Sequence, residues 1–216
     1  MVGKQEETTE GTFAEQEKTN KEPSLFKNPV FQNIMLVILV MCATIGIRAY
    51  AVELFKIPSA SMENTLIPED IVLVNKLDKN IHRGDIVVFN ENTSGQIYIK
   101  RVIGLPGDTI ELKDQRVYVN GNPLDEDYTI GETFNSINRS HDEFLSEEQK
   151  SVDLTQPIKI PSNSYWLMGD NREDSRDSRF FGPVSSNQII GKAIYRVAPI
   201  DRFGEIEQTE SSNNNA

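Results

Sequence analysis

An uncharged apolar run near the N-terminus is the clearest pattern in the sequence. It extends from Asn28 to Ile47, and most of its residues are large and apolar. A helix needs about 20 such residues to cross the hydrocarbon core of a bilayer, so the run predicts one transmembrane helix over residues 28–50. A buried core helix is the alternative. A cleavable signal peptide fits less well, because the leader is long and acidic and the run exceeds a signal peptide's apolar segment.

After Ile57 the pattern changes to short runs rich in β-branched residues, separated by turn residues. These runs predict strands, and Asn120-Gly121 predicts a tight hairpin. Helical periodicity is scarce. The expected fold class is therefore mainly β, an antiparallel domain over residues 51–204 behind the transmembrane helix. The runs are DIVLVNK (70–76), GDIVVFN (84–90), IYIKRVIG (97–104), DTIEL (108–112), RVYVNGNPL (116–124), SYWLMGD (164–170) and IIGKAIYRV (189–197).

Both ends of the chain are polar. Residues 1–27 and 205–216 are poor in apolar side chains, which predicts disordered tails.

Slightly more lysine precedes the apolar run than follows it, and positive charge favours the cytoplasmic side of a membrane. We therefore expect a single-pass protein of the cell membrane, with a cytoplasmic N-terminus and an extracytoplasmic β domain. Residues 125–158 are also polar, and the sequence assigns them no function.

The composition excludes some functions. The formal net charge is −11, which disfavours nucleic acid as a partner because phosphate binding needs a basic surface. Cys42 is the single cysteine, so neither an intramolecular disulfide nor a cysteine zinc cluster can form. His82 and His141, the two histidines, lie in polar surroundings, which argues against a Ser-His-Asp triad and against a His/Cys metal site. We expect no metal and no cofactor.

Three segments combine residues that can carry chemistry. They are IPSASMENTL (57–66), YIKRVIGLPGD (98–108) and MGDNREDSRDSRFFGPV (168–184). Strand alternation places Lys100 on one face with Tyr98 and Val102, where its amine would be partly desolvated. Each segment also has a plainer interpretation: a serine-rich turn, a lysine that extends its ammonium to water, and a solvated charged loop.

Together the segments resemble the motif set of the type I signal peptidases (leader peptidases), serine endopeptidases with a Ser-Lys dyad. IPSASM is similar to the nucleophile box, GDIVVF to the next strand box, YIKRVIGLPGD to the lysine box and GDNREDSRDSR to the late box. They follow the family's order behind an anchor, over roughly residues 30–204. One departure is Asn64, which stands where the family often has proline and so lacks proline's φ restraint.

The resemblance implies a role for each matching residue. Ser61 would be the nucleophile and Lys100 its general base. A serine hydroxyl reacts once a base removes its proton, and a buried lysine can do so when its pKa falls well below roughly 10.4. Ser59 would form the oxyanion hole with the Ser61 N–H, and Ser175 would orient the lysine amine. Structural support would come from Arg101, Gly169, Asp170 and an Asp177–Arg179 ion pair.

The resemblance also implies the partners. The substrates would be secretory preproteins, cut after Ala-x-Ala-like sites while bound as an added strand, and the anchor would lie in the lipid bilayer. Two apolar pockets would hold the small substrate side chains. They would be lined by Ile57, Met62, Leu66 and Tyr98, and by Phe55, Val88 and Ile99.

Two other functions remain open. A self-cleaving peptidase of the SOS-repressor type shares a related β fold, but it usually carries a DNA-binding head instead of an apolar anchor. A catalytically inactive, membrane-tethered β binding module would keep the fold without the reaction. The presence of Ser61, Lys100, Ser59 and Ser175 favours the enzyme, whereas inertness towards preproteins would favour the binding module.

Overall fold

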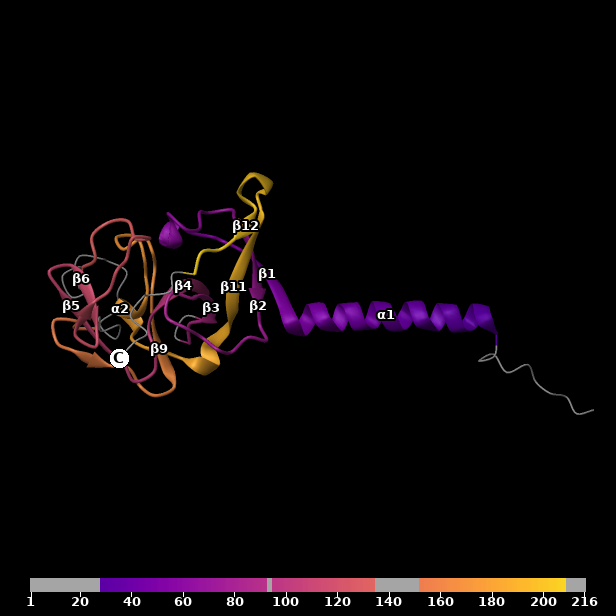
Figure 1. Ribbon diagram of the computed structural model, residues 1–216, viewed down its shortest axis with the longest axis horizontal. Coiled ribbons are helices and arrows are strands. Elements are labelled where there is room, and N and C mark those ends of the chain that lie inside the picture. The colour runs from indigo at the N-terminus through magenta and orange to yellow at the C-terminus, as the bar shows by residue number, and fades with distance from the viewer. Residues whose placement is uncertain (1–27, 93–94, 135–151, 209–216) are drawn as a thin grey trace, which may run out of the picture. The chain divides into compact units, whose positions relative to one another are not determined.

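The computed structural model describes residues 28–92, 95–134 and 152–208, and the chain divides into two compact units after Thr44 (Figure 1). The helix α1 spans Pro29–Ala51, and Asn28 caps it by accepting the Val30 N–H at 3.0 Å. Residues Pro29–Ile47 are long and apolar enough to cross a membrane, and none of the apolar stretch is buried in the protein. The helix therefore has the length of a membrane anchor and not the burial of a core helix. The predicted tail over residues 1–27 lies outside the described residues.

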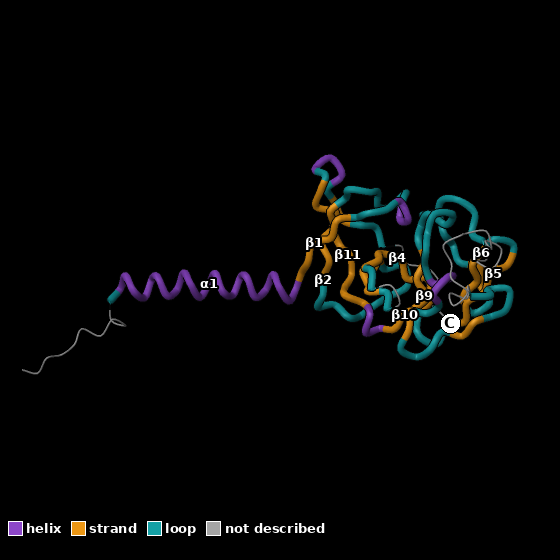
Figure 2. The backbone as a smooth tube through the Cα atoms, turned by 180° about the vertical axis from the view of Figure 1, so that it is seen from behind, coloured by secondary structure: helices purple, strands orange, loops and turns teal. Residues whose placement is uncertain are grey.

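The described part of the second unit consists mainly of antiparallel strands, which confirms the predicted fold class (Figure 2). The larger sheet has the order β1-β2-β11-β3-β4-β9-β10, with β12 paired to β11, and the smaller sheet has the order β7-β6-β5-β8. Strands β5 and β6 lie beyond β4 and β9, on the side away from β2 and β11 (Figures 1 and 2).

Each predicted run contains or overlaps a strand, whereas β1, β8, β10 and β12 correspond to no predicted run. The strands of the larger sheet are β1 (Val52–Lys56), β2 (Ile71–Asn75), β3 (Ile86–Asn90), β4 (Ile97–Gly104), β9 (Ser164–Met168), β10 (Val184–Ser185), β11 (Ile189–Ala198) and β12 (Gly204–Glu205). Those of the smaller sheet are β5 (Thr109–Lys113), β6 (Arg116–Val119), β7 (Asn122–Pro123) and β8 (Ile158–Lys159). Short helices complete the unit: η2 (Ala60–Met62), α2 (Ser178–Phe181), η4 (Ser186–Gln188) and η5 (Ile200–Arg202).

The predicted hairpin is present between β6 and β7. Asn120 and Gly121 have φ angles of 51° and 82°. Two successive residues with positive φ are what a type I′ turn requires, and asparagine followed by glycine adopts them at little cost. This turn sets the register between β6 and β7.

Strand β4 is an interior strand of the larger sheet, because it pairs with β3 on one side and β9 on the other. Its last six residues are buried on both faces. Ile99, Ile103 and Val102 each belong to a different one of the three buried apolar clusters. A polar residue in this part of β4 is therefore withdrawn from water whichever way it points.

The folded chain extends past the predicted C-terminal boundary at residue 204. Ile206 is buried, and Gln208 accepts the Ile86 N–H at 2.8 Å and donates to the Ala193 carbonyl at 2.8 Å. The prediction of a disordered tail from residue 205 is thus wrong for residues 205–208. Its remainder, residues 209–216, lies outside the described part of the chain.

Candidate active site

Ser61 lies in the short helix η2, on the loop that joins β1 to β2. Two apolar side chains hold this loop: Ile57 before the serine and Leu66 after it are both packed in the first core cluster. The loop is closed where Asp70 O accepts the Ile57 N–H at 2.8 Å and Ile57 O accepts the Glu69 N–H at 3.0 Å. The serine is therefore presented by a firmly packed turn.

Lys100 reaches Ser61 from the middle of β4. Its Nζ lies 2.6 Å from the Ser61 Oγ and 3.0 Å from the Ile99 carbonyl oxygen. Lys100 is 2% exposed and Ser61 6% exposed. Burial lowers the pKa of Lys100 to about 8, although the carboxylates of Asp177 and Asp170 act in the opposite direction. A neutral amine at this position can accept the proton of the serine hydroxyl.

Ser59 stands at the start of the same turn. Its side chain is exposed, and its hydroxyl donates to the Ser61 Oγ at 3.3 Å. The hydroxyl is thus beside the nucleophile, as an oxyanion donor must be. Its predicted role in an oxyanion hole stays a prediction.

The loop after β9 packs directly on the nucleophile. A Cβ on Gly169 would lie 2.2 Å from the Ser175 Oγ and 2.4 Å from the Ser61 carbonyl oxygen, so only glycine fits between them. The Asn171 N–H donates to that same carbonyl at 3.2 Å. The backbone of Gly169–Asn171 therefore fixes the backbone of Ser61.

The remainder of the late segment forms a buried polar cluster. Ser175 Oγ donates to Asp177 Oδ2 at 2.6 Å, and Arg179 binds both oxygens of Asp177 at 2.8 Å. Burial alone would raise the pKa of Asp177, but the charge and hydrogen bonds of Arg179 outweigh it and lower that pKa. The cluster also receives the Gly169 N–H at 3.0 Å. The structure thus pairs Asp177 with Arg179, while the contact of Ser175 with the lysine amine stays a prediction.

Arg101 points away from Lys100 and forms a second buried ion pair. Its Nε and Nη2 bind Asp170 at 2.9 and 2.8 Å. The Thr65 hydroxyl donates to Asp170 Oδ2 at 2.6 Å. Asp170 is thereby joined to the loop of the nucleophile as well as to β4.

A cleft of about 400 Å³ opens beside the serine and the lysine. Five of the predicted pocket residues line it: Phe55, Ile57, Val88, Tyr98 and Ile99. Met62 and Leu66 do not, because both are fully buried in the first core cluster. The cleft also has four lining residues that the sequence analysis missed, Lys56, Pro58, Gln96 and Ile97. Lys56 and Ile97 lie in β1 and β4 with Phe55 and Tyr98, and Pro58 and Gln96 flank those two strands. Their closeness in sequence to predicted pocket residues is the signal that could have found them.

The departure at Asn64 has a clear structural counterpart. Its φ is 87°, which the ring of proline cannot adopt because it fixes φ near −65°. The Asn64 side chain also donates to the Tyr128 carbonyl at 3.0 Å. At this position the loop therefore has a backbone conformation suited to asparagine or glycine.

Of the two histidines, the structure describes His82, which takes no part in this arrangement. His82 is exposed in the turn before β3, with its ring near Asp85, and His141 lies outside the described residues. Within residues 28–92, 95–134 and 152–208, no three His, Cys, Asp or Glu side chains gather as they would around a metal ion. The chemistry available at the cleft is that of a hydroxyl nucleophile beside a buried amine, an arrangement suited to acyl transfer.

Comparisons with known proteins agree with this class of site. Residues 30–198 match the family model of signal peptidase, peptidase S26. The chain is 36% identical over 191 residues to signal peptidase I of Leptolyngbya laminosa, covering 83% of this chain and 85% of that protein. It is 33% identical over 205 residues to signal peptidase I of Bacillus licheniformis, covering 92% of this chain and 100% of that protein.

A solved structure is also similar, the crystal structure of a signal peptidase I from Enterococcus faecalis V583. It is 33% identical, with a TM-score of 0.39, and the match covers 52% of this chain and 96% of that one. The family match spans well over half of the sequence. The protein is therefore a serine endopeptidase. It belongs to the signal peptidase family, peptidase S26, as the resemblance of its motifs indicated.

Proposed function

We propose that this protein removes signal peptides from secretory preproteins by acyl transfer to Ser61, with Lys100 as general base. The observation that carries the proposal is the 2.6 Å separation between Lys100 Nζ and Ser61 Oγ at the edge of an apolar cleft. Burial lowers the pKa of Lys100 to about 8. A fraction of the amine is therefore neutral near physiological pH. The relatives named above are signal peptidases I, which supports this class of substrate.

In the proposed reaction, neutral Lys100 takes the proton of Ser61 while Oγ attacks the scissile carbonyl carbon. The negative charge on the carbonyl oxygen is stabilised by the Ser59 hydroxyl and the Ser61 N–H, in the manner of an oxyanion hole. The tetrahedral intermediate collapses when the Lys100 ammonium protonates the departing amine. Water, activated by the same lysine, then hydrolyses the ester and regenerates Ser61.

The cleft suits an extended peptide with small side chains. Its walls come from the end of β1 and the start of β4, and its apolar lining includes Ile57, Val88 and Ile99. A peptide laid between two strands gains main-chain hydrogen bonds, while pockets for alternate side chains provide specificity. We infer cleavage after Ala-x-Ala-like sites, because small side chains fit shallow apolar pockets.

The anchor sets the proposed location of the reaction. We infer that α1 spans the cell membrane with the N-terminus in the cytoplasm and the β unit outside, because the preceding leader carries the lysine excess. Protease added to intact cells should then digest the β unit. Its protection until the membrane is opened would overturn this orientation.

Cleavage of a purified preprotein by the full-length protein in detergent tests the proposal. Wild type should cut after the Ala-x-Ala site, and Ser61→Ala and Lys100→Ala should each lose at least about 10³-fold in rate. Lys113→Ala, at an exposed lysine, is the matched control and should retain full activity. Near-normal activity of folded Lys100→Ala would place the base elsewhere. An inert wild type would instead favour a binding module.

A further inference from the structure

The segment after β7 lies against the loop that packs on Ser61. We name residues Glu126–Thr133 the strap. The Ile130 N–H donates to the Asp170 carbonyl at 3.0 Å, and the Arg172 N–H donates to the Ile130 carbonyl at 2.9 Å. These bonds form a short parallel bridge between the strap and the loop that packs on Ser61. The strap is therefore joined to the catalytic centre through its backbone.

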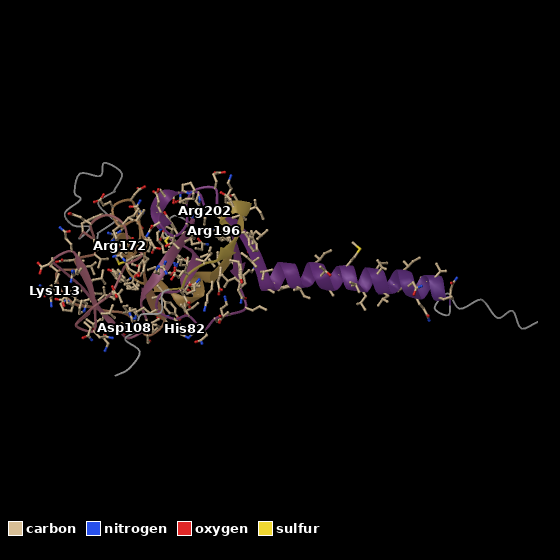
Figure 3. All side chains as sticks on the ribbon, turned by 45° about the horizontal axis from the view of Figure 1, so that its top comes forward. His82, Asp108, Lys113, Arg172, Arg196 and Arg202 are labelled. Atoms are coloured by element: carbon tan, nitrogen blue, oxygen red, sulfur yellow. The ribbon has the colours of Figure 1, made fainter. Side chains whose placement is uncertain are left out.

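Arg172 fastens both ends of the strap. It has no exposed surface, and its guanidinium binds the Glu126 carboxylate near one end and the Thr133 hydroxyl, at 2.9 Å, at the other. Its Nε donates to the Gly169 carbonyl at 3.0 Å. Figure 3 shows Arg172 inside the β unit, whereas Lys113 lies at its periphery. A buried charge with so many partners is costly to displace, so the strap is held in one position.

Tyr128 connects the strap to the strand of the general base. The Arg101 guanidinium carbon lies 4.2 Å from the centre of the Tyr128 ring, which is close enough for an attraction between the cation and the ring face. Asn64, three residues after the nucleophile, donates to the Tyr128 carbonyl at 3.0 Å. Tyr128 is absent from the lining of the cleft. One residue therefore contacts both β4 and the nucleophile loop without facing a bound peptide.

We propose that Tyr128 is a positioning residue for this active site, because its ring fixes the Arg101 guanidinium and, through Asp170, the Gly169–Asn171 backbone against Ser61. This inference rests on the proposed serine-lysine reaction. Without the ring, Arg101 keeps its bonds to Asp170 but one face of its guanidinium loses its packing, so the Arg101–Asp170 pair and the Asn171 N–H are held less closely in position. A small displacement of reacting groups has a large effect on rate, while the cleft that binds the peptide is left unchanged.

Loss of the ring should change two measurable quantities, kcat and the pH at which activity falls on the acid side. In Tyr128→Ala we expect kcat to fall about tenfold with KM nearly unchanged. The acid limb of the pH profile should also move to higher pH. Asp170 raises the pKa of Lys100, and this effect should grow when Arg101 no longer neutralises the carboxylate closely.

The experiment compares Tyr128→Phe, Tyr128→Leu and Tyr128→Ala in the full-length protein, with melting temperatures measured alongside. Tyr118→Ala is the control, since Tyr118 also lies over a basic side chain, that of Lys113, but on the smaller sheet. Tyr128→Phe should retain activity because the ring remains over Arg101. Tyr128→Leu keeps much of the volume without the aromatic face, so it decides the matter if Tyr128→Ala does not fold.

Support for the proposal requires a fall in kcat for Tyr128→Leu or Tyr128→Ala, with rescue by phenylalanine and a shifted acid limb. Equal losses in Tyr118→Ala, or an unshifted pH profile, would reduce Tyr128 to a purely structural residue and overturn the proposal. If Tyr128→Ala has the same kcat as the wild type, the positioning role is overturned while the proposed function stands. An inert wild-type protein would overturn the proposed function together with it.

Discussion

Lys100 and Arg101 are neighbours on β4, and they are almost equally withdrawn from water, at 2% and 1% exposed. Their surroundings differ completely. The Lys100 amine is bonded to a hydroxyl and a carbonyl. Arg101 has the carboxylate of Asp170 in a two-point ion pair and the Gly84 carbonyl at 2.9 Å. The same depth of burial therefore acts on two basic residues with different results.

The difference lies in the chemistry of the two side chains as well as in their partners, because a buried lysine can lose its proton whereas an arginine cannot. Burial without a bonded carboxylate lowers the pKa of Lys100 to about 8, which suits a base. Arginine stays charged in proteins, and its planar guanidinium matches a carboxylate at two points, which suits a fixed support. One strand thus provides a proton acceptor on one face and a permanent ion pair on the other.

Removing the counter-charge of Arg101 should have the largest effect on stability. Asp170→Asn leaves a buried guanidinium without its carboxylate, and we expect a loss of about 3–5 kcal/mol in the free energy of unfolding. Denaturation of the detergent-solubilised protein measures it. The control is Glu69→Gln, which breaks an exposed ion pair with Lys56 and should change stability by less than about 1 kcal/mol. Equal, small losses in the two variants would refute the special status of Asp170.

Removing the amine on the other face should instead stabilise the protein at neutral pH. The pKa of Lys100 falls from 10.5 to about 8 on burial. Burial of this amine therefore lowers the free energy of unfolding by its full amount below pH 8, where Lys100 is protonated in both the folded and the unfolded state. The loss disappears as the pH rises through 10.5. Lys100→Met should be inactive but more stable at pH 7, by up to about 3 kcal/mol. Melting temperatures across this pH range test the idea, and an advantage independent of pH would contradict it.

The pH dependence of cleavage should report the same lysine. Activity should rise with pH and level off above a midpoint near 8, the lowered pKa of Lys100. Between pH 8 and pH 6 the rate should fall roughly fifty-fold, because the neutral fraction of the amine falls by that factor. Values of kcat/KM for a peptide substrate, obtained from initial rates at each pH, give the profile. A midpoint near 10 would mean that burial does not tune this base.

The smallest expected effect concerns the loop beside Arg101. Asn64→Ala should cost about 1 kcal/mol of stability, since alanine is strained at a φ of 87° and the bond to the Tyr128 carbonyl is lost. Asn64→Gly removes the same hydrogen bond but accepts this φ, so thermal unfolding should show a smaller loss. If glycine proved no better than alanine, backbone strain would not account for the loss at this position.

Local patterns in the sequence predicted much of this fold. The period of β4 placed Lys100 and Arg101 on opposite faces, and the Asn120-Gly121 pair marked a hairpin, because both depend only on neighbours along the chain. The nucleophile and the base were assigned from a resemblance of motifs. The same resemblance implied that Met62 lines a pocket, yet it is buried in the core. Such a distinction depends on how the turn packs, which no local pattern contains.

Contacts between distant segments account for what was not predicted. Tyr128 lies in a polar region without periodicity, and its position depends on Arg101 and Asn64, which are far away in sequence. Ile206 belongs to a segment too short and polar to indicate a strand, but β11 supplies its partner. The strap and the end of the fold are thus properties of the assembled sheets.

The hydrogen bonds of Glu207 and Gln208 have a consequence for how far the chain can be shortened from its C-terminal side. The Glu207 carbonyl is an acceptor for Arg101 at 3.3 Å, and Gln208 joins β3 to β11. Removal of residues 205–208 should therefore destabilise the β unit, because these hydrogen bonds within and between strands are lost. Thermal unfolding of truncated forms measures the loss, and a recombinant β unit should end beyond residue 208.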